Sequence, residues 1–223
     1  MNNHPNEGVL KRIKAVDVNL SEEEQVEQLK KWWKENGTSV IAGVVIGLGG
    51  VFGWQYWTQH QQSIAEQASA QFEQLNHSVA TGAENLATVQ AEGVINNYHD
   101  SSYAVFSALS LAKLKLQQDD AAGAKVQLQW VLDNTTDQSL KQVARLRKAR
   151  ILLSEGDAEA VEAIVATAPD DNFRGTFAEL KGDAALLKGD KSAARQAYGQ
   201  ALELQAGNSA LVQMKFDDLA AVE

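Results

Sequence analysis

An uncharged stretch of 20 residues, 38–57, restricts the structure of this chain more than any other segment. As a helix such a stretch is about 30 Å long, which equals the thickness of the hydrocarbon core of a bilayer. Aromatic rings, which prefer the membrane–water interface, stand near both of its ends: Trp32, Trp33, Trp54, Tyr56 and Trp57. The sequence therefore predicts one transmembrane helix, with residues 58–223 on a single side of the membrane.

The distribution of basic residues predicts the orientation of this helix. Six Lys and Arg residues precede the stretch, and none follows it before Lys113. Because the basic flank of a span stays in the cytoplasm, we expect a cytoplasmic N-terminus and a periplasmic C-terminal domain, in the inner membrane of a Gram-negative bacterium. A cleaved signal peptide is disfavoured, since 37 residues precede the stretch and the nearest Ala-x-Ala, residues 68–70, lies well beyond it.

The composition of residues 58–223 excludes several classes of function. They contain 14 Lys and Arg against 22 Asp and Glu, a net charge of −8, which argues against binding nucleic acid. The chain has no cysteine, which removes disulfides, thiolate catalysis and cysteine metal sites. Alanine and leucine recur at helical spacing, so the predicted fold class is all-α.

Two segments precede the span. Residues 1–20 lack sustained periodicity and are interpreted as a mobile cytoplasmic tail. Residues 21–37 predict a basic amphipathic helix that Asn36 and Gly37 terminate. This helix either lies on anionic lipid or simply leads into the span, and the sequence does not distinguish the two.

Glycines within the span suggest a helix-packing face. Gly43 and Gly47, and likewise Gly49 and Gly53, are four residues apart, a spacing that lets two membrane helices approach closely. Glycine is also common in membrane helices without such a role. Whether the partner would be a second copy or another protein stays open.

Two helices are expected directly after the span. The first runs from the membrane into the domain, carries Ile64, Ala68, Phe72 and Leu75 at helical spacing, and ends near Gly82. The second covers residues 84–98, with Leu86, Val89 and Val94 facing inward.

A degenerate repeat follows. Small residues at Ala112, Ala149 and Gly182 are spaced by 37 and 33 residues. Further positions recur at fixed distances from them: Ala124, Val161 and Ala194; Leu128, Val165 and Tyr198; Val131, Ala168 and Ala201. This pattern is typical of tetratricopeptide repeats, whose period is 34, and predicts an α-solenoid of helical hairpins. An unrelated helical bundle is the alternative.

Residues capable of chemistry do not form a recognisable catalytic set. The four histidines are scattered, and no nucleophile elbow or phosphate-binding loop is present. Adjacent aspartates at 119–120 and 170–171 are interpreted as helix caps. We therefore expect neither an enzyme nor a cofactor.

The first helices of the repeats offer a surface for a partner. Positions three residues before and one residue after each small residue predict a partner groove that combines apolar and charged side chains: Leu109, Lys113, Leu146, Arg150, Glu179 and Asp183. The alternative is a solvated wall without a ligand.

The sequence EEEQVEQLKKWWKENG, the glycine-rich span that ends in GWQYW, and the three-unit repeat together resemble the ancillary SecYEG translocon subunits of proteobacteria, the YfgM family. The resemblance implies a single-pass inner-membrane protein with a periplasmic tetratricopeptide-like domain. It also implies association with SecYEG channel subunits and with a membrane-anchored periplasmic prolyl-isomerase-type chaperone, which would help translocating polypeptides to fold. The alternative is a membrane-anchored repeat scaffold for another envelope-assembly complex.

Overall fold

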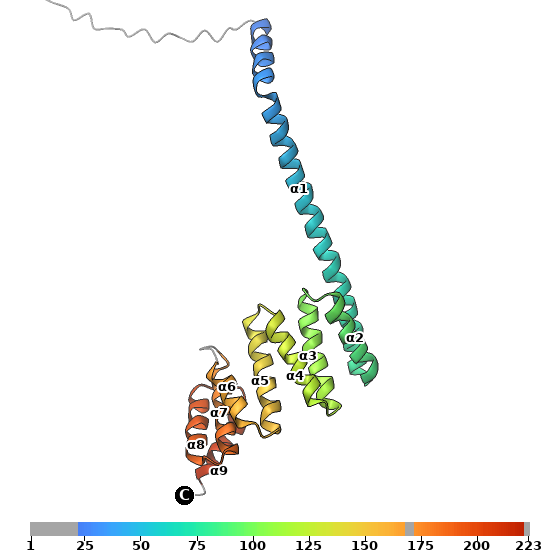
Figure 1. Ribbon diagram of the computed structural model, residues 1–223. Helices are drawn as coiled ribbons and strands as arrows, with labels where there is room; N and C mark the ends of the chain where they lie inside the picture. Colours follow the sequence, from blue (N-terminus) through green and yellow to red (C-terminus); the bar gives the residue numbers. More distant parts are fainter. Residues whose placement is uncertain (1–21, 168–171, 221–223) are drawn as a thin grey trace, which may run out of the picture. The chain divides into compact units, whose positions relative to one another are not determined.

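The computed structural model describes residues 22–167 and 172–220, and within these ranges all regular structure is helical (Figure 1). The chain divides into two compact units, residues 1–59 and 60–223. The all-α prediction is confirmed. The predicted tail at residues 1–20 and the predicted helix start at Ser21 lie outside the described residues.

The first helix, α1 (Glu22–Ala80), is continuous through Asn36 and Gly37, so the prediction that these residues terminate a helix was wrong. A glycine inside a helix costs only about 1 kcal/mol, and here the Trp33 indole lies over it. A Cβ built on Gly37 would stand 3.2 Å from that ring. The Asn36 side chain donates to the carbonyl of Trp32 at 3.0 Å, a contact within the helix rather than a cap.

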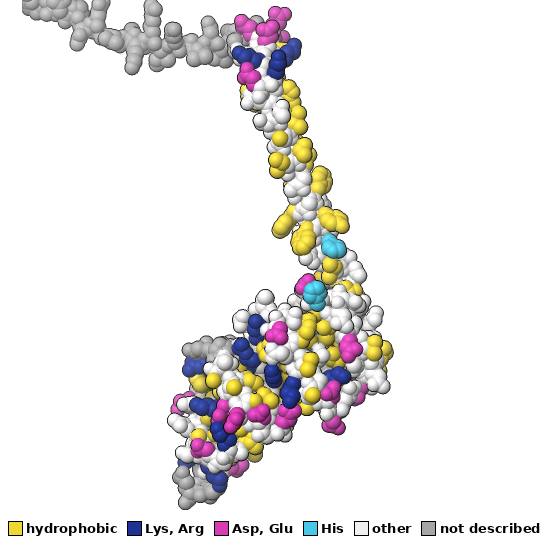
Figure 2. Space-filling model, in the orientation of Figure 1, with side chains coloured by type: hydrophobic (Ala, Val, Ile, Leu, Met, Phe, Trp, Pro, Cys, Tyr) yellow, Lys and Arg dark blue, Asp and Glu magenta, His cyan; other side chains and the backbone are white. Residues whose placement is uncertain are grey.

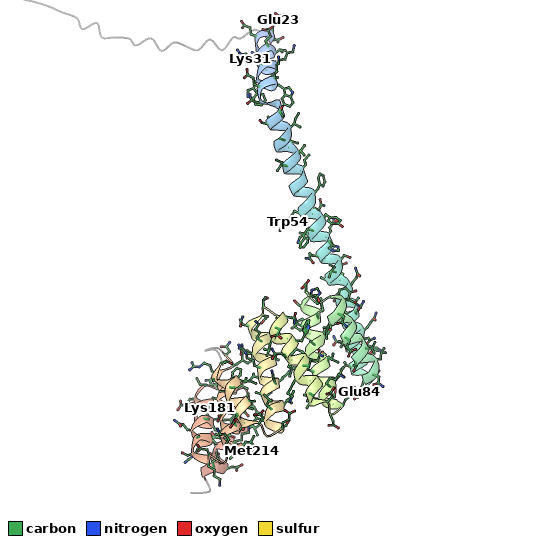
Figure 3. All side chains as sticks on the ribbon, in the orientation of Figure 1. Glu23, Lys31, Trp54, Glu84, Lys181 and Met214 are labelled. Carbon is green, nitrogen blue, oxygen red and sulfur yellow. The ribbon has the colours of Figure 1, made fainter. Side chains whose placement is uncertain are left out.

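Among the described residues, α1 is the one helix that is long and apolar enough to cross a membrane, judged by length and composition. Its large apolar side chains are exposed in the unit formed by residues 1–59, among them Ile46 (75%) and Trp54 (72%), the latter labelled in Figure 3. Soluble monomers rarely expose a contiguous apolar surface of this kind. These features fit a membrane-spanning helix.

The unit formed by residues 60–223 contains the end of α1 and the other helices in chain order. Their bounds are α2 (Glu84–Asn97), α3 (Ser102–Gln117), α4 (Ala121–Asn134), α5 (Gln138–Ser154), α6 (Ala158–Ala166), α7 (Arg174–Leu187), α8 (Lys191–Glu203) and α9 (Ser209–Ala220). From α2 to α9 each helix packs against the next, and α5 also packs against α7. The pairs α3–α4, α5–α6 and α7–α8 are the three predicted hairpins.

The predicted ends of the two helices after the span agree with the structure to within a few residues, but one predicted face does not. Ala68 and Leu75 are fully buried. On α2, however, Leu86 and Val89 are 52% and 66% exposed, so placing them inward was wrong. The buried face instead carries Ala87, Ala91, Val94 and Ile95. Alanines let α2 lie close to its neighbours, and this close packing outweighs the size of the side chains on the other face.

The repeat positions are buried as the pattern predicts. Ala112 and Ala149 are buried on α3 and α5, while Ala124, Val161 and Ala194 are fully buried on the second helices. Leu128 and Tyr198 fill the bulky position, Val165 is partly buried, and Ala168 lies outside the described residues. In the third repeat Gly182 lies directly against the Tyr198 ring, so that a Cβ at this position would overlap it.

The turns inside the hairpins repeat one capping arrangement. Gly156 and Gly189 adopt φ of 84° and 81° after the first helix, a conformation that glycine tolerates without strain. The aspartate that follows then caps the second helix, Asp157 at 3.0 Å from the nitrogen of Ala160 and Asp190 at 2.9 Å from that of Ala193. In the first repeat, Asp119 holds φ of 59° and Asp120 accepts from the nitrogen of Gly123 at 2.7 Å. The interpretation as a helix cap is confirmed for Asp120, while Asp119 lies in the turn before it. Residues 170–171 lie outside the described residues.

Candidate partner-binding site

The structure separates the six residues of the predicted groove into three groups. Leu109 and Leu146 belong to the hydrophobic core, with 8% and 6% of their surface exposed. Lys113 and Arg150 are exposed and line one cavity. Glu179 and Asp183 bind a lysine of α9. The six residues therefore do not form one continuous surface.

The cavity that Lys113 and Arg150 share lies between α3 and α5, with α4 beneath, and will be called the α3–α5 pocket. Its volume is about 390 Å³. Its lining combines basic side chains with an apolar floor: Lys113, Arg147 and Arg150; Ala112, Leu116, Leu128 and Ile151; and Ser154. Such a lining can hold an apolar group while cations bind an adjacent anion.

Helical spacing explains why these side chains line the same pocket. Arg147 and Arg150 are three residues apart on α5, so both point from the same side of that helix. Leu116 stands three residues after Lys113 on α3 in the same way. Spacing by three from Lys113 and Arg150 could have identified Arg147 and Leu116, which the sequence-based prediction did not include. Figure 2 shows several Lys and Arg side chains gathered over α5.

The two predicted groove residues of the third repeat, Glu179 and Asp183, bind a side chain of α9. Lys215 donates to Glu179 Oε1 at 2.8 Å and to Asp183 Oδ1 and Oδ2 at 2.8 and 2.9 Å. The Tyr198 hydroxyl donates to Asp183 Oδ1 at 2.7 Å. Because Lys215 already satisfies both carboxylates, they contribute to the packing of α9 rather than to a free binding surface.

This network shifts two ionisation equilibria. Burial by itself lowers the pKa of Lys215, but the hydrogen bonds and negative charges of Asp183 and Glu179 outweigh burial, and the pKa is raised. Burial, with a smaller contribution from the hydrogen bond to Asp183, raises the pKa of Tyr198 far above its usual value of 10.0. Both groups therefore keep their protons well into the alkaline range.

The structure leaves free space beside the four glycines that are predicted to pack against another helix in the membrane. Within the described residues, no atom outside the local helix lies within 4 Å of a Cβ built on Gly43, Gly47, Gly49 or Gly53. Residues four apart lie on the same side of a helix, so Gly43 and Gly47 share one side of α1 and Gly49 and Gly53 share another. Each of these two sides leaves room for another helix to approach.

Comparison with known proteins places the whole architecture in one family. The profile of the tetratricopeptide repeat-like domain family matches residues 30–221. An ancillary SecYEG translocon subunit of Haemophilus influenzae is 34% identical over 182 residues, which cover 82% of this chain and 89% of that protein. The protein of the same name from Escherichia coli is 30% identical over 207 residues, covering 92% of this chain and 100% of that protein. A third, from Aggregatibacter actinomycetemcomitans, is 32% identical over 202 residues, or 90% and 98% of the two chains.

Proposed function

The chain belongs to the family of the ancillary SecYEG translocon subunits, and from this we propose that it is a non-catalytic adaptor, anchored in the inner membrane, that associates with the SecYEG channel. The observation that carries the proposal is the extent of the similarity. The alignment with the Escherichia coli protein leaves out only 8% of this chain, so it must include residues 38–57 as well as the repeats. A match to the repeats alone would support only a protein-binding module.

The finer part of the proposal concerns what the adaptor connects. We propose that the N-terminus is cytoplasmic and that the helical domain is periplasmic, where it binds a membrane-anchored chaperone of the prolyl-isomerase type. The asymmetry of basic residues around the span supports this orientation. The open α3–α5 pocket supports binding of another polypeptide by the domain. Bringing a chaperone to the channel would help newly translocated proteins to fold.

The two glycine pairs of α1 are proposed as contacts within the membrane. Lipid provides no hydrophobic force between helices, so close backbone approach at small residues is what favours their pairing. Gly43, Gly47, Gly49 and Gly53 allow such an approach from outside the chain. The partner proposed here is a helix of the channel.

Site-specific photocrosslinking in living cells tests both contacts. A photoreactive residue in place of Gly47 should crosslink to a channel subunit, and one in place of Ser154 should crosslink to a periplasmic chaperone or a translocating polypeptide. Leu204, the C-cap residue of α8, belongs neither to the span nor to the lining of the α3–α5 pocket and is the control position. Crosslinks from Gly47 to envelope-synthesis proteins instead of the channel would favour a repeat scaffold for another envelope-assembly complex and contradict the adaptor proposal.

A further inference from the structure

Two of the three first helices of the repeats carry only positive charge. Helix α3 contains Lys113 and Lys115 without a carboxylate. Helix α5 contains five basic residues and no acidic one: Lys141, Arg145, Arg147, Lys148 and Arg150. Helix α7, in contrast, mixes both signs. Of the seven cations of α3 and α5, Lys115 pairs with Asp120 at 3.5 Å, whereas Lys113, Arg147 and Arg150 line the α3–α5 pocket. In a domain whose net charge is −8, the pocket is therefore a basic region.

The cations of the pocket are not neutralised by the protein itself. Neither Lys113 nor Arg150 forms an ion pair with any residue that the structure describes. Arg147 donates to the backbone carbonyl of Leu109 at 3.3 Å, a contact that leaves its positive charge uncompensated. None of the described residues that line the pocket is acidic. By comparison, Lys125 elsewhere on the domain is paired with Glu155 at 2.6 Å.

The apolar floor of the pocket favours a ligand that also carries an apolar group. Leu128 and Ile151 are almost fully buried at its base, and Leu116 is 42% exposed at its edge. An apolar side chain placed here would remove apolar surface from water at about 25 cal/mol per Å². A volume of about 390 Å³ lies near the lower limit for ligand pockets (about 300–1,000 Å³), so it suits a few side chains rather than a whole helix.

We propose that the α3–α5 pocket binds a polypeptide segment in which carboxylate side chains flank an apolar side chain. The apolar side chain occupies the floor, and the carboxylates bind Lys113, Arg147 and Arg150. This inference rests on the proposed function in one respect, since it supplies the recognition chemistry for the partner of the adaptor. Charged side chains at the rim of the pocket favour fast, reversible binding, which suits a protein that transfers its partner.

Fluorescence anisotropy with the full-length protein in detergent micelles tests this directly. The probe is a short labelled peptide with two glutamates on each side of a leucine and an amidated C-terminus. Peptides with glutamine for glutamate, or serine for leucine, are the ligand controls. Both should bind at least about tenfold more weakly, since each loses one of the two interactions. Equal binding of all three peptides would overturn the proposal.

Charge-reversal variants identify the site. The double variant Lys113→Glu with Arg150→Glu should weaken binding about tenfold or more, and Leu116→Ser should also weaken it. The matched control Lys181→Glu with Lys191→Glu changes the net charge equally on α7 and α8 and should have little effect; Lys181 is labelled in Figure 3. Leu186→Ser is the control for Leu116→Ser, because both leucines are 42% exposed. If both double variants weaken peptide binding equally, the change in net charge alone explains the effect, and the proposal is overturned.

Two further readouts separate this inference from its alternatives. Binding of anionic phospholipid vesicles through Lys113 and Arg150, without peptide binding, would assign the pocket to lipid and overturn the proposal. In the same double variant, the crosslink from Gly47 to the channel should persist while peptide binding is lost. If the wild-type protein crosslinks to the channel but does not bind the peptide, the inference fails and the adaptor proposal stands. If it binds the peptide but never crosslinks to the channel, the adaptor proposal fails alone.

Discussion

At the scale of single residues, Gly182 controls the packing of the third repeat. The Tyr198 ring occupies the space where a larger residue at position 182 would place its Cβ. The first two repeats have alanine at the equivalent positions, Ala112 and Ala149, and smaller residues than tyrosine opposite them. Glycine and tyrosine therefore form a complementary pair that preserves the spacing between the helices.

The variant Gly182→Ala should lower the free energy of unfolding by about 1–3 kcal/mol, because the added methyl group overpacks the contact with Tyr198. The matched control is Gly93→Ala, inside α2, where no described atom lies within 4 Å of the new Cβ. That substitution should be neutral or stabilise the domain by up to about 1 kcal/mol through helix propensity. Thermal unfolding followed by circular dichroism measures both, and an equal response of the two variants would contradict this explanation.

Lys215 makes the stability of the folded domain depend on pH in the alkaline range. A lysine with a raised pKa in the folded state stabilises that state fully below its unfolded pKa of 10.5, and the stabilisation is lost as pH rises through the folded value. Tyr198 acts in the same direction, since the unfolded tyrosine ionises near pH 10.0 while the folded one resists ionisation. We expect the melting temperature of the wild type to fall steeply above about pH 10.

The variant Lys215→Met should lower stability at pH 7 by about 1–2 kcal/mol. The value is modest because a quarter of the lysine side chain is exposed, so that solvent screens its charge. Above pH 10 the difference between wild type and variant should shrink. A difference that stays constant up to pH 12 would show that the ion pairs with Glu179 and Asp183 do not cause the effect.

At the scale of elements, the residue type at each hairpin turn determines how much backbone strain the turn carries. The turn between α3 and α4 places Asp119 at φ of 59°, where the other two repeats place a glycine. A residue with a Cβ is strained in this conformation. The first repeat therefore retains the capping arrangement at a local cost that the other repeats avoid.

The variant Asp119→Gly should stabilise the domain by about 0.5–1 kcal/mol, since the relief of strain exceeds the added entropy of the unfolded chain. Its reciprocal, Gly156→Asp, should destabilise the second hairpin, because it places a Cβ at φ of 84°. Chemical unfolding in urea measures both changes. If Asp119→Gly does not stabilise the domain and Gly156→Asp does not destabilise it, the assigned strain is contradicted.

The span within α1 gives a prediction about insertion. Gly47→Arg should weaken membrane insertion by about 2.5–3.5 kcal/mol, because it places a charge near the middle of the apolar stretch. Gly47→Ala keeps the stretch apolar and should remain in the membrane. Extraction of membranes at alkaline pH measures the released fraction. Identical retention of the two variants would argue against a spanning role for residues 38–57.

At the scale of the whole molecule, the chain combines an anchor with a helical domain whose surfaces differ along its length. The cations that line the α3–α5 pocket have no acidic neighbour in its described lining, whereas the carboxylates of α7 are bound by α9. The domain therefore has one basic region available for a partner and a closed C-terminal end. This arrangement suits an adaptor with a single polar docking site.

The orientation of the anchor determines which compartment this docking site meets. An enzyme reporter that is active only in the periplasm should be active when fused after Glu223 and inactive when fused within residues 1–20. The reason is the excess of basic residues before the span. Activity at the N-terminal fusion alone would reverse the orientation and remove the proposed periplasmic partners.

Much of the fold could be predicted because it depends on local features. The span, the helical periodicity, the three repeats and the Gly-Asp caps all follow from residue type and spacing within a few turns. The face of α2 was predicted wrongly because Leu86 and Val89 are the larger apolar residues, yet Ala87 and Ala91 allow the closer packing. The end at Gly37 was wrong because Trp33 covers that glycine within a continuous helix.

The sequence by itself determined a membrane anchor followed by tetratricopeptide-like hairpins, because apolarity, helical period and turn conformation are local properties of the chain. Only the tertiary structure decided which residues of the first helices are exposed and which are buried or paired. It buried Leu109 and Leu146, left Lys113 and Arg150 open, and brought Lys215 from 32 residues away to Asp183. Contacts between distant segments determine exposure and charge pairing, and the spacing of residues within one helix does not specify them.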